Sequence, residues 1–223
     1  MALSPMMQQY LQIKEENPGC LLMFRLGDFY ELFFDDAKIV SEQLQLVLTA
    51  RDSGDGQRAP MCGVPHHAVD GYLTKLISKG FRVAICEQLE DPATTKGLVK
   101  RGVVRIVSPG TVTEGGFLKD ESNNYLASFA ADAFCYGLAF AEISTGEVFA
   151  TELMGEDKAA ALYAELAAFS PAEAVLPENA PSEAVACFNK FRVLISTEEN
   201  EQPTQYTSAS AGVRRHTTLE RIL

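Results

Sequence analysis

Long apolar runs are absent from this chain of 223 residues. No stretch approaches the roughly 20 consecutive apolar residues that a membrane helix needs, so a membrane-spanning protein is not indicated. The N-terminus also lacks a basic start followed by an apolar core, which is the pattern of a secretory signal. We therefore expect a cytoplasmic chain that has no membrane partner.

The cysteines do not form the pattern of a disulfide framework. They are odd in number, widely spaced and placed mostly inside apolar runs, at Cys20, Cys62, Cys86, Cys135 and Cys187. Disulfide-stapled domains are typically short secreted chains with an even number of cysteines. The pattern therefore predicts reduced, buried thiols.

An excess of basic residues is also missing, because the formal net charge is -11. A protein that coats nucleic acid nonspecifically would need such an excess. The negative charge is concentrated late in the chain. Residues 1–118 contain 12 Lys and Arg against 14 Asp and Glu, whereas residues 119–223 contain 7 against 16. The stretch 92–113 has no acidic residue and carries Lys96, Lys100, Arg101 and Arg105. A local basic strip of this kind is the pattern to look for in a DNA-binding domain.

Apolar periodicity predicts that strands and helices alternate in the first half of the chain. A helix begins at Ser4-Pro5, a second is capped by Asp35-Asp36, and a third begins at Pro65 and ends before Gly80, which occupies its C′ position. The remaining elements are buried strands at 20–26, 81–86 and 103–107, a drift toward a strand at 46–49, and a polar, flexible loop at 51–58. Interleaved strands and helices indicate an α/β or α+β domain with a mixed sheet.

Residues 114–123 are rich in glycine and charge, which predicts a linker between two domains, 1–113 and 124–223. The second domain is expected to begin with a three-strand meander and to continue with alternating helices and strands. Its strands are predicted at 125–130, 134–143, 147–153, 174–176 and 191–195, and its helices at 158–169 and 182–190. One more helix is expected to start at Arg214.

The motif Gly27-Asp28-Phe29-Tyr30-Glu31 directly follows the predicted strand 20–26. Gly27 permits a sharp turn. Judged by residue type alone, both aromatic rings belong to the core, because most aromatic residues are buried. In an extended segment, however, Phe29 and Glu31 point to one side and Tyr30 points to the other.

Five further segments accompany the motif: Ser4–Tyr10, Met61–Ala68, Ala84–Gln88, Asp91–Gly97 and Val104–Thr111. Over residues 4–113 these segments, with their order and spacing, resemble the N-terminal part of the MutS mismatch-repair family. After about residue 120 only the element pattern is similar. The resemblance implies a mixed-sheet mismatch-recognition domain at 1–113. It also implies a ribonuclease H-like connector domain at 124–223, cut within or just after its last elements.

The resemblance implies that the protein recognises DNA mismatches by inserting Phe29 as a wedge at a mispaired or looped base. Unstacking a base step costs a few kcal/mol, and stacking a base on the ring returns roughly 1–3 kcal/mol. A mispaired step opens more easily than a paired one, so the ring can discriminate by deformability. Glu31 is implied to accept a hydrogen bond from the displaced base, and Tyr30 is assigned to the core.

Other DNA contacts implied by the resemblance are Arg51 near the DNA backbone, and Pro60 and Met61 at the minor groove. The basic strip itself suggests that Lys96, Lys100 and Arg101 neutralise phosphates. Each phosphate contact adds a salt-dependent increment to the affinity. The plain alternative for each of these cations is a solvated surface charge.

Two other functions remain open. A ribonuclease H-like shape is also typical of metal-dependent nucleases, for which the second domain offers Asp132, Glu142 and Glu147. A non-catalytic protein-interaction module is the other alternative. Cys62, His66 and His67 are too few and too poorly spaced for a zinc site, and no catalytic residue or metal ligand is expected.

No Gly-x-x-x-x-Gly-Lys-Ser/Thr loop occurs in the sequence. We therefore expect an N-terminal fragment that is not itself an enzyme and holds no cofactor. The resemblance implies that the full-length protein dimerises through parts outside this chain and binds ATP and Mg²⁺. It further implies that a MutL-type partner contacts the connector, in a bacterial cytoplasm and close to the nucleoid.

Overall fold

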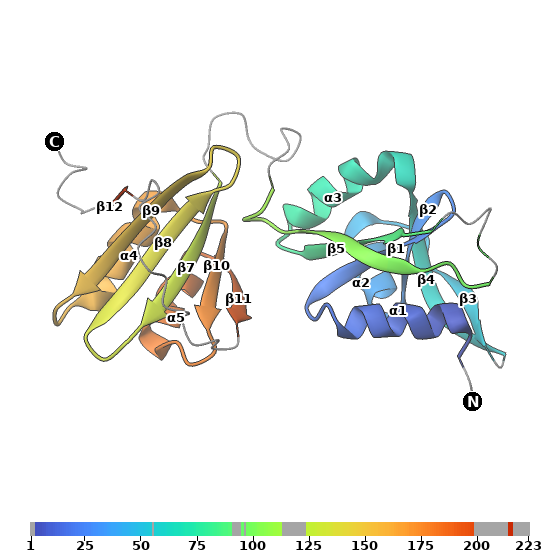
Figure 1. Cartoon of the computed structure of the whole chain (residues 1–223), viewed down its shortest axis with the longest axis horizontal. Helices are drawn as coiled ribbons and strands as arrows, with labels where there is room; N and C mark the ends of the chain where they lie inside the picture. The colour runs from blue at the N-terminus through green and yellow to red at the C-terminus, as the bar shows by residue number, and fades with distance from the viewer. Residues whose placement is uncertain are drawn as a thin grey trace. The chain divides into compact units, whose positions relative to one another are not determined.

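The chain folds into two compact units, Met1–Ser108 and Pro109–Leu223, each built on a mixed six-stranded sheet (Figure 1). The structure, a computed structural model, describes residues 3–54, 56–90, 95, 97–112 and 124–198 and the backbone of 214–215. The predicted linker at 114–123 lies outside the described residues. The mixed α/β class predicted from the sequence is confirmed for both units.

Unit 1 contains most of the predicted functional residues. Its elements are α1 (Pro5–Glu15), β1 (Cys20–Leu26), β2 (Phe29–Phe33), α2 (Phe34–Leu44), β3 (Thr49–Gly54), β4 (Gln57–Pro65), η1 (His66–Ala68), α3 (Val69–Ile77), β5 (Arg82–Gln88) and β6 (Arg101–Val107). The strand order is β3-β4-β2-β1-β5-β6. β1 and β5 are parallel, and the other neighbouring pairs are antiparallel. Figure 1 shows α1 and α3 on opposite sides of this sheet.

The core of unit 1 follows from the alternation of side chains along β1. Leu22 and Phe24 point to one face and pack with Met7, Tyr10 and Ile13 of α1. Ser4 caps α1 by accepting a hydrogen bond from the amide of Met7 at 3.4 Å, as its position before Pro5 predicts. The predicted first helix and first strand are therefore confirmed.

A buried carboxylate ties three elements of unit 1 together. Asp36 was predicted to cap α2 but lies inside its first turn, because the cap position falls on Phe33. The Asp36 side chain instead accepts hydrogen bonds from Lys14 Nζ at 2.8 Å and from the Leu22 amide at 2.9 Å. Burial and the neighbouring Asp36 carboxylate raise the pKa of Tyr10, whose hydroxyl also contacts Asp36.

The predicted loop at 51–58 is the main error of the sequence analysis in unit 1. Residues 51–54 lie in β3 and residues 57–58 lie in β4, and these two strands pair antiparallel as a β-hairpin. The dipeptide Asp55-Gly56 between the two strands is a known hairpin signal, which the polar composition of the segment obscured. Pro65 is likewise the last residue of β4 and does not begin a helix.

Unit 2 consists of β7 (Tyr125–Ala131), β8 (Cys135–Glu142), β9 (Glu147–Met154), α4 (Lys158–Phe169), β10 (Glu173–Pro177), α5 (Ser182–Lys190), β11 (Leu194–Glu198) and β12 (Arg214–Arg215). The strand order is β11-β10-β7-β8-β9-β12. β7, β8 and β9 form the predicted antiparallel meander, and β10 runs parallel to both β7 and β11. This arrangement is consistent with a ribonuclease H-like sheet.

The core of unit 2 lies between the sheet and the two helices. Alternate residues of β7 and β8 pack against α4 and α5, and Phe140 stacks on Phe169 with ring centroids 4.0 Å apart. Both helices coincide with their predicted ranges. The predicted strand at 191–195 begins later, because Arg192 turns the chain with a φ of 55°. The helix expected from Arg214 is wrong at its start, where Arg214–Arg215 is a short strand paired with β9.

Among the described residues, the structure has no helix with both the length and the apolar character that a membrane crossing requires.

Candidate nucleic-acid interface

Phe29 is an exposed ring at the start of an otherwise buried strand. The residue is 47% exposed, while Tyr30 and Leu32 are 3% and 0% exposed. The preceding turn depends on Gly27, whose φ of +58° lies in the left-handed region that favours glycine. Strand alternation therefore separates the two aromatic rings of the motif as predicted, with Tyr30 in the core and Phe29 in solvent.

Glu31 shares the sheet face of Phe29 and forms an ion pair that the sequence did not predict. Arg51 Nη1, from β3, donates to Glu31 Oε2 at 2.5 Å across the intervening strand β4. The residue of β4 opposite Glu31 is Gly63, and a Cβ there would lie 3.5 Å from Glu31 Cγ. The absence of a side chain at Gly63 therefore leaves room around the Glu31 carboxylate.

The register of β4 separates the two residues predicted to line the minor groove. Met61 pairs with Phe33 and Thr49, which places it on the same sheet face as Glu31 and Arg51. Pro60 has the opposite parity and shares its face with Cys62 and Val64. The structure therefore brings Phe29, Glu31, Arg51 and Met61 to one face and does not place Pro60 with them.

The basic strip lies at the same end of the sheet as Phe29. β1 and β5 are parallel, with Phe24 opposite Cys86, so the turn after β1 and the segment after β5 leave the sheet at one end. Lys100 is exposed there, and its amide donates to Glu90 Oε2 at 3.1 Å. Lys96 lies outside the described residues.

Arg101 does not belong to the exposed strip. Its side chain is buried, and its guanidinium donates to Arg25 O at 2.9 Å and to Gln9 Oε1 and Val99 O at 3.0 Å each. The guanidinium also lies 5.0 Å from the centre of the Phe24 ring. Because these protein acceptors engage the charge, the prediction that Arg101 binds phosphate finds no support in the structure.

A cluster of Arg25, Tyr30 and Glu87, which the sequence did not predict, lies on the sheet face opposite Phe29. The Tyr30 hydroxyl donates to Glu87 Oε1, and Arg25 Nη1 lies 3.5 Å from Glu87 Oε2. Burial, followed by the hydrogen bond to Glu87, raises the pKa of Tyr30 to about 12. The available signal was Arg25 itself, the one charged residue in the apolar strand Cys20–Leu26.

The Cys62 thiol is placed for packing and not for reaction. Cys62 is 1% exposed, whereas His66 and His67 are exposed in the 3-10 turn that follows β4. Burial, and then the nearby Asp36 carboxylate, raise the pKa of the Cys62 thiol to about 11. A nucleophilic cysteine needs a lowered pKa, so this environment does not favour thiol catalysis.

Of the three carboxylates considered for a nuclease in unit 2, Glu142 and Glu147 lie opposite each other on β8 and β9, but Asp132 does not join them. Asp132 precedes β8 and Glu142 ends it, so the strand separates them by roughly 20 Å. Glu142 is buried. Burial opposes its ionisation, but hydrogen bonds from Ser144 and Thr145 outweigh that effect and lower its pKa. Across all described residues, no group of three or more His, Cys, Asp or Glu side chains is arranged to hold a metal ion.

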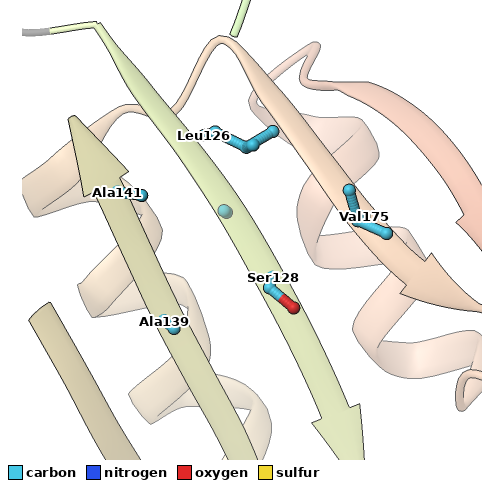
Figure 2. A pocket seen from close by; sticks show the side chains of 6 residues that line it. Leu126, Ser128, Ala139, Ala141 and Val175 are labelled. Atoms are coloured by element: carbon cyan, nitrogen blue, oxygen red, sulfur yellow. The ribbon is translucent and has the colours of Figure 1, made fainter. Parts of the chain in front are cut away.

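An open hollow lies on the face of the unit 2 sheet opposite α4 and α5 (Figure 2). Leu126, Ser128, Ala139, Ala141 and Val175 line it, together with Ala127. Apart from Ala127, which belongs to the core, these side chains alternate with the core residues of the same strands and therefore point away from the helices. The lining offers one hydroxyl and no charged group, so it does not resemble a catalytic centre.

Comparison with known proteins identifies both units. Residues 4–116 match the family model described as MutS domain I, and residues 124–214 match MutS domain II. The DNA mismatch repair protein MutS of Syntrophomonas wolfei is 54% identical over 173 residues, which are 78% of this chain and 20% of the relative. The MutS protein of Clostridium botulinum strain Hall is 52% identical over 179 residues, which are 80% of this chain and 19% of the relative.

Among solved structures, a simian T-cell lymphotropic virus intasome in complex with PP2A regulatory subunit B56 gamma overlaps 38% of each chain. Its TM-score of 0.27 and identity of 14% are too low to carry an argument. This chain spans about a fifth of the length of the curated relatives that it matches. The two family models together cover most of the sequence, and the chain belongs to the MutS family.

Proposed function

We propose that unit 1 recognises mismatched double-stranded DNA through Phe29, as part of DNA mismatch repair. The observation that carries the proposal is an aromatic residue left 47% exposed at the start of a strand whose next four residues are partly or fully buried. In the folded unit 1, part of the Phe29 ring therefore has no apolar contact. A base exposed at a mispaired step would supply the missing stacking surface, worth roughly 1–3 kcal/mol.

Discrimination in this proposal comes from the energy needed to open the duplex. Inserting an apolar ring between base pairs unstacks them at a cost of a few kcal/mol. A mispaired or looped base is already poorly stacked, so opening there costs less than at a paired step. The ring therefore selects a deformable site without reading a base sequence.

Glu31 would accept a hydrogen bond from the displaced base. Arg51 donates to Oε2, and among the described residues no donor contacts Oε1, which is therefore available for a base. The Arg51 cation also offsets the repulsion between the Glu31 carboxylate and nearby phosphates. In this arrangement Arg51 would contact both the Glu31 carboxylate and the DNA backbone. Met61, which lies on the same sheet face, would contact the minor groove.

The remaining parts of the proposal concern the whole protein. Lys100, and Lys96 in the same strip, would neutralise phosphates and make binding salt-dependent. By family membership we further propose a dimer that uses ATP and Mg²⁺ at parts outside this chain, with a MutL-type partner on the connector domain at 124–223. Such a protein would act in the bacterial cytoplasm close to the nucleoid.

The test is Phe29→Ala in the protein at its natural length, titrated with a paired duplex and with the same duplex carrying one mismatch. At one fixed salt concentration, the preference for the mismatch should be lost while binding to paired DNA persists. Phe134→Ala is the matched control, because Phe134 is a still more exposed phenylalanine in unit 2. A Phe29→Ala protein that keeps its preference would overturn the proposal.

A further inference from the structure

The β1–β2 turn that carries Phe29 is held at both of its carbonyl groups. Arg25 Nε donates to Gly27 O at 2.5 Å, and the amide of His66 donates to Asp28 O at 2.8 Å. Phe29 is the next residue along the chain. The two bonds approach from different strands, since Arg25 lies in β1 and His66 follows β4. The turn is thus fixed from both sides of the hairpin.

Three neighbours contact Arg25, so the residue that donates the hydrogen bond to the turn is itself held in place. Its Nη1 lies 3.5 Å from Glu87 Oε2, and its guanidinium lies 5.5 Å from the centre of the Tyr30 ring. Its own carbonyl accepts a hydrogen bond from the buried guanidinium of Arg101. The Arg25 side chain is only 17% exposed, so the ion pair with Glu87 is partly shielded from water.

From this geometry we propose that Arg25 is a positioning residue for mismatch recognition, acting through the turn that presents Phe29. The inference rests on the proposed function of Phe29. A wedge that is already fixed in its bound orientation loses little conformational freedom when it inserts, whereas a mobile wedge must be ordered at a cost in affinity. Paired DNA, which does not admit the ring, gains nothing from this order. Arg25 therefore affects the mismatch complex alone.

The substitution Arg25→Lys separates positioning from charge. Lysine keeps a cation for Glu87 but lacks the planar fork through which Arg25 contacts both Gly27 O and the Tyr30 ring. In the protein at its natural length, the affinity for a single-mismatch duplex should fall roughly three- to tenfold. The affinity for the paired duplex and the melting temperature should stay unchanged.

Two further measurements make the test specific. Amide hydrogen exchange over Asp28–Tyr30 should speed up in Arg25→Lys without DNA, which a merely electrostatic role would not cause. In a Phe29→Ala background, Arg25→Lys should cause no further loss of mismatch affinity, because both act through one ring. Arg58→Lys is the matched control, since Arg58 Nη2 also donates to a backbone carbonyl, that of Ala50 at 2.7 Å. That contact lies in the β3–β4 hairpin, away from the Phe29 turn.

The outcomes distinguish the two proposals. If Phe29→Ala retains its preference for mismatched DNA, the proposed function fails, and the positioning role fails with it. If Phe29→Ala loses the preference while Arg25→Lys keeps it and leaves hydrogen exchange unchanged, only the positioning role fails. Equal losses on both duplexes, together with a lower melting temperature, would also overturn it, because they indicate a general structural role.

Discussion

Phe29 in unit 1 and Phe134 in unit 2 are both exposed phenylalanines next to a strand end, yet their surroundings differ. Phe29 is 47% exposed and Phe134 is 83% exposed. The turn before Phe29 is held at two carbonyls, and a carboxylate paired with Arg51 lies two residues further on. The turn at Phe134 is organised by Asp132, whose carboxylate accepts hydrogen bonds from the amides of Phe134 and Cys135.

The electrostatic difference between the two rings is equally large. Hydrogen bonds from the two amides lower the pKa of the exposed Asp132 carboxyl and keep a negative charge beside Phe134. The segment 119–223 that contains Phe134 carries most of the net negative charge of the chain. Phe29 lies at the sheet end where the chain leaves β5 and where the exposed Lys100 precedes β6. The two phenylalanines are therefore alike in being exposed and differ in the charge of the segments around them.

The largest expected effect tests whether Phe29 belongs to the core. Phe33→Ala, four residues along the same strand, removes a fully buried ring and should lower the free energy of unfolding by about 3–5 kcal/mol. Phe29→Ala should change it by less than about 1 kcal/mol. Phe140→Ala and Phe134→Ala are the corresponding pair in unit 2. Urea unfolding followed by circular dichroism provides the measurement. A large loss in Phe29→Ala would show that the ring is a packing residue.

The next effect concerns Glu31, the carboxylate that lies two residues after Phe29 and pairs with Arg51. Glu31→Ala should lower mismatch discrimination by about tenfold, since a hydrogen bond to a charged group contributes about 1.5–3 kcal/mol. Affinity for paired DNA should hold or rise, because a negative charge near phosphates is removed. Glu31→Gln, which keeps an acceptor oxygen, should retain part of the discrimination. Glu156→Ala removes an exposed acid of unit 2 and serves as the control in duplex titrations.

The cluster of Arg25, Tyr30 and Glu87 predicts a pH effect confined to unit 1. The folded-state pKa of Tyr30 is raised to about 12, so its contribution to stability is fully present below about pH 10 and is lost as the pH rises toward 12. The unfolding free energy of the wild type should therefore fall more steeply over this range than that of Tyr30→Phe, and the two curves should converge. Parallel curves, measured by urea unfolding from pH 9 to 12, would contradict the raised pKa.

The smallest effect tests the basic strip. Lys100→Ala should make the slope of log affinity against log salt concentration shallower by about 0.9, the value for one lost phosphate contact. Lys190→Ala removes an exposed cation from unit 2 and should leave the slope unchanged. Titration of a paired duplex over a range of salt concentrations measures both. An unchanged slope in Lys100→Ala would assign this lysine to a solvated surface.

Local rules were sufficient to predict much of the fold and part of the candidate site. Strand alternation separated Phe29 from Tyr30, and helical periodicity placed α4 and α5 at their observed bounds. The hairpin at 49–65 was missed because polar residues outnumber apolar ones there, so pairing with a neighbouring strand decides the structure. Asp36 was misplaced for a similar reason, since its position is fixed by Lys14 and Leu22 from other elements.

The sequence by itself determined which residue types occur at the site and which side of β2 each of them occupies, because alternation along a strand is a property of the local backbone. Only the tertiary structure decided how they are used. Strand register brought Arg51 to Glu31, buried the charge of Arg101 and placed Arg25 against the turn before Phe29. Most of these contacts join residues distant in sequence, and their partners depend on how strands pair and on which charges remain in water.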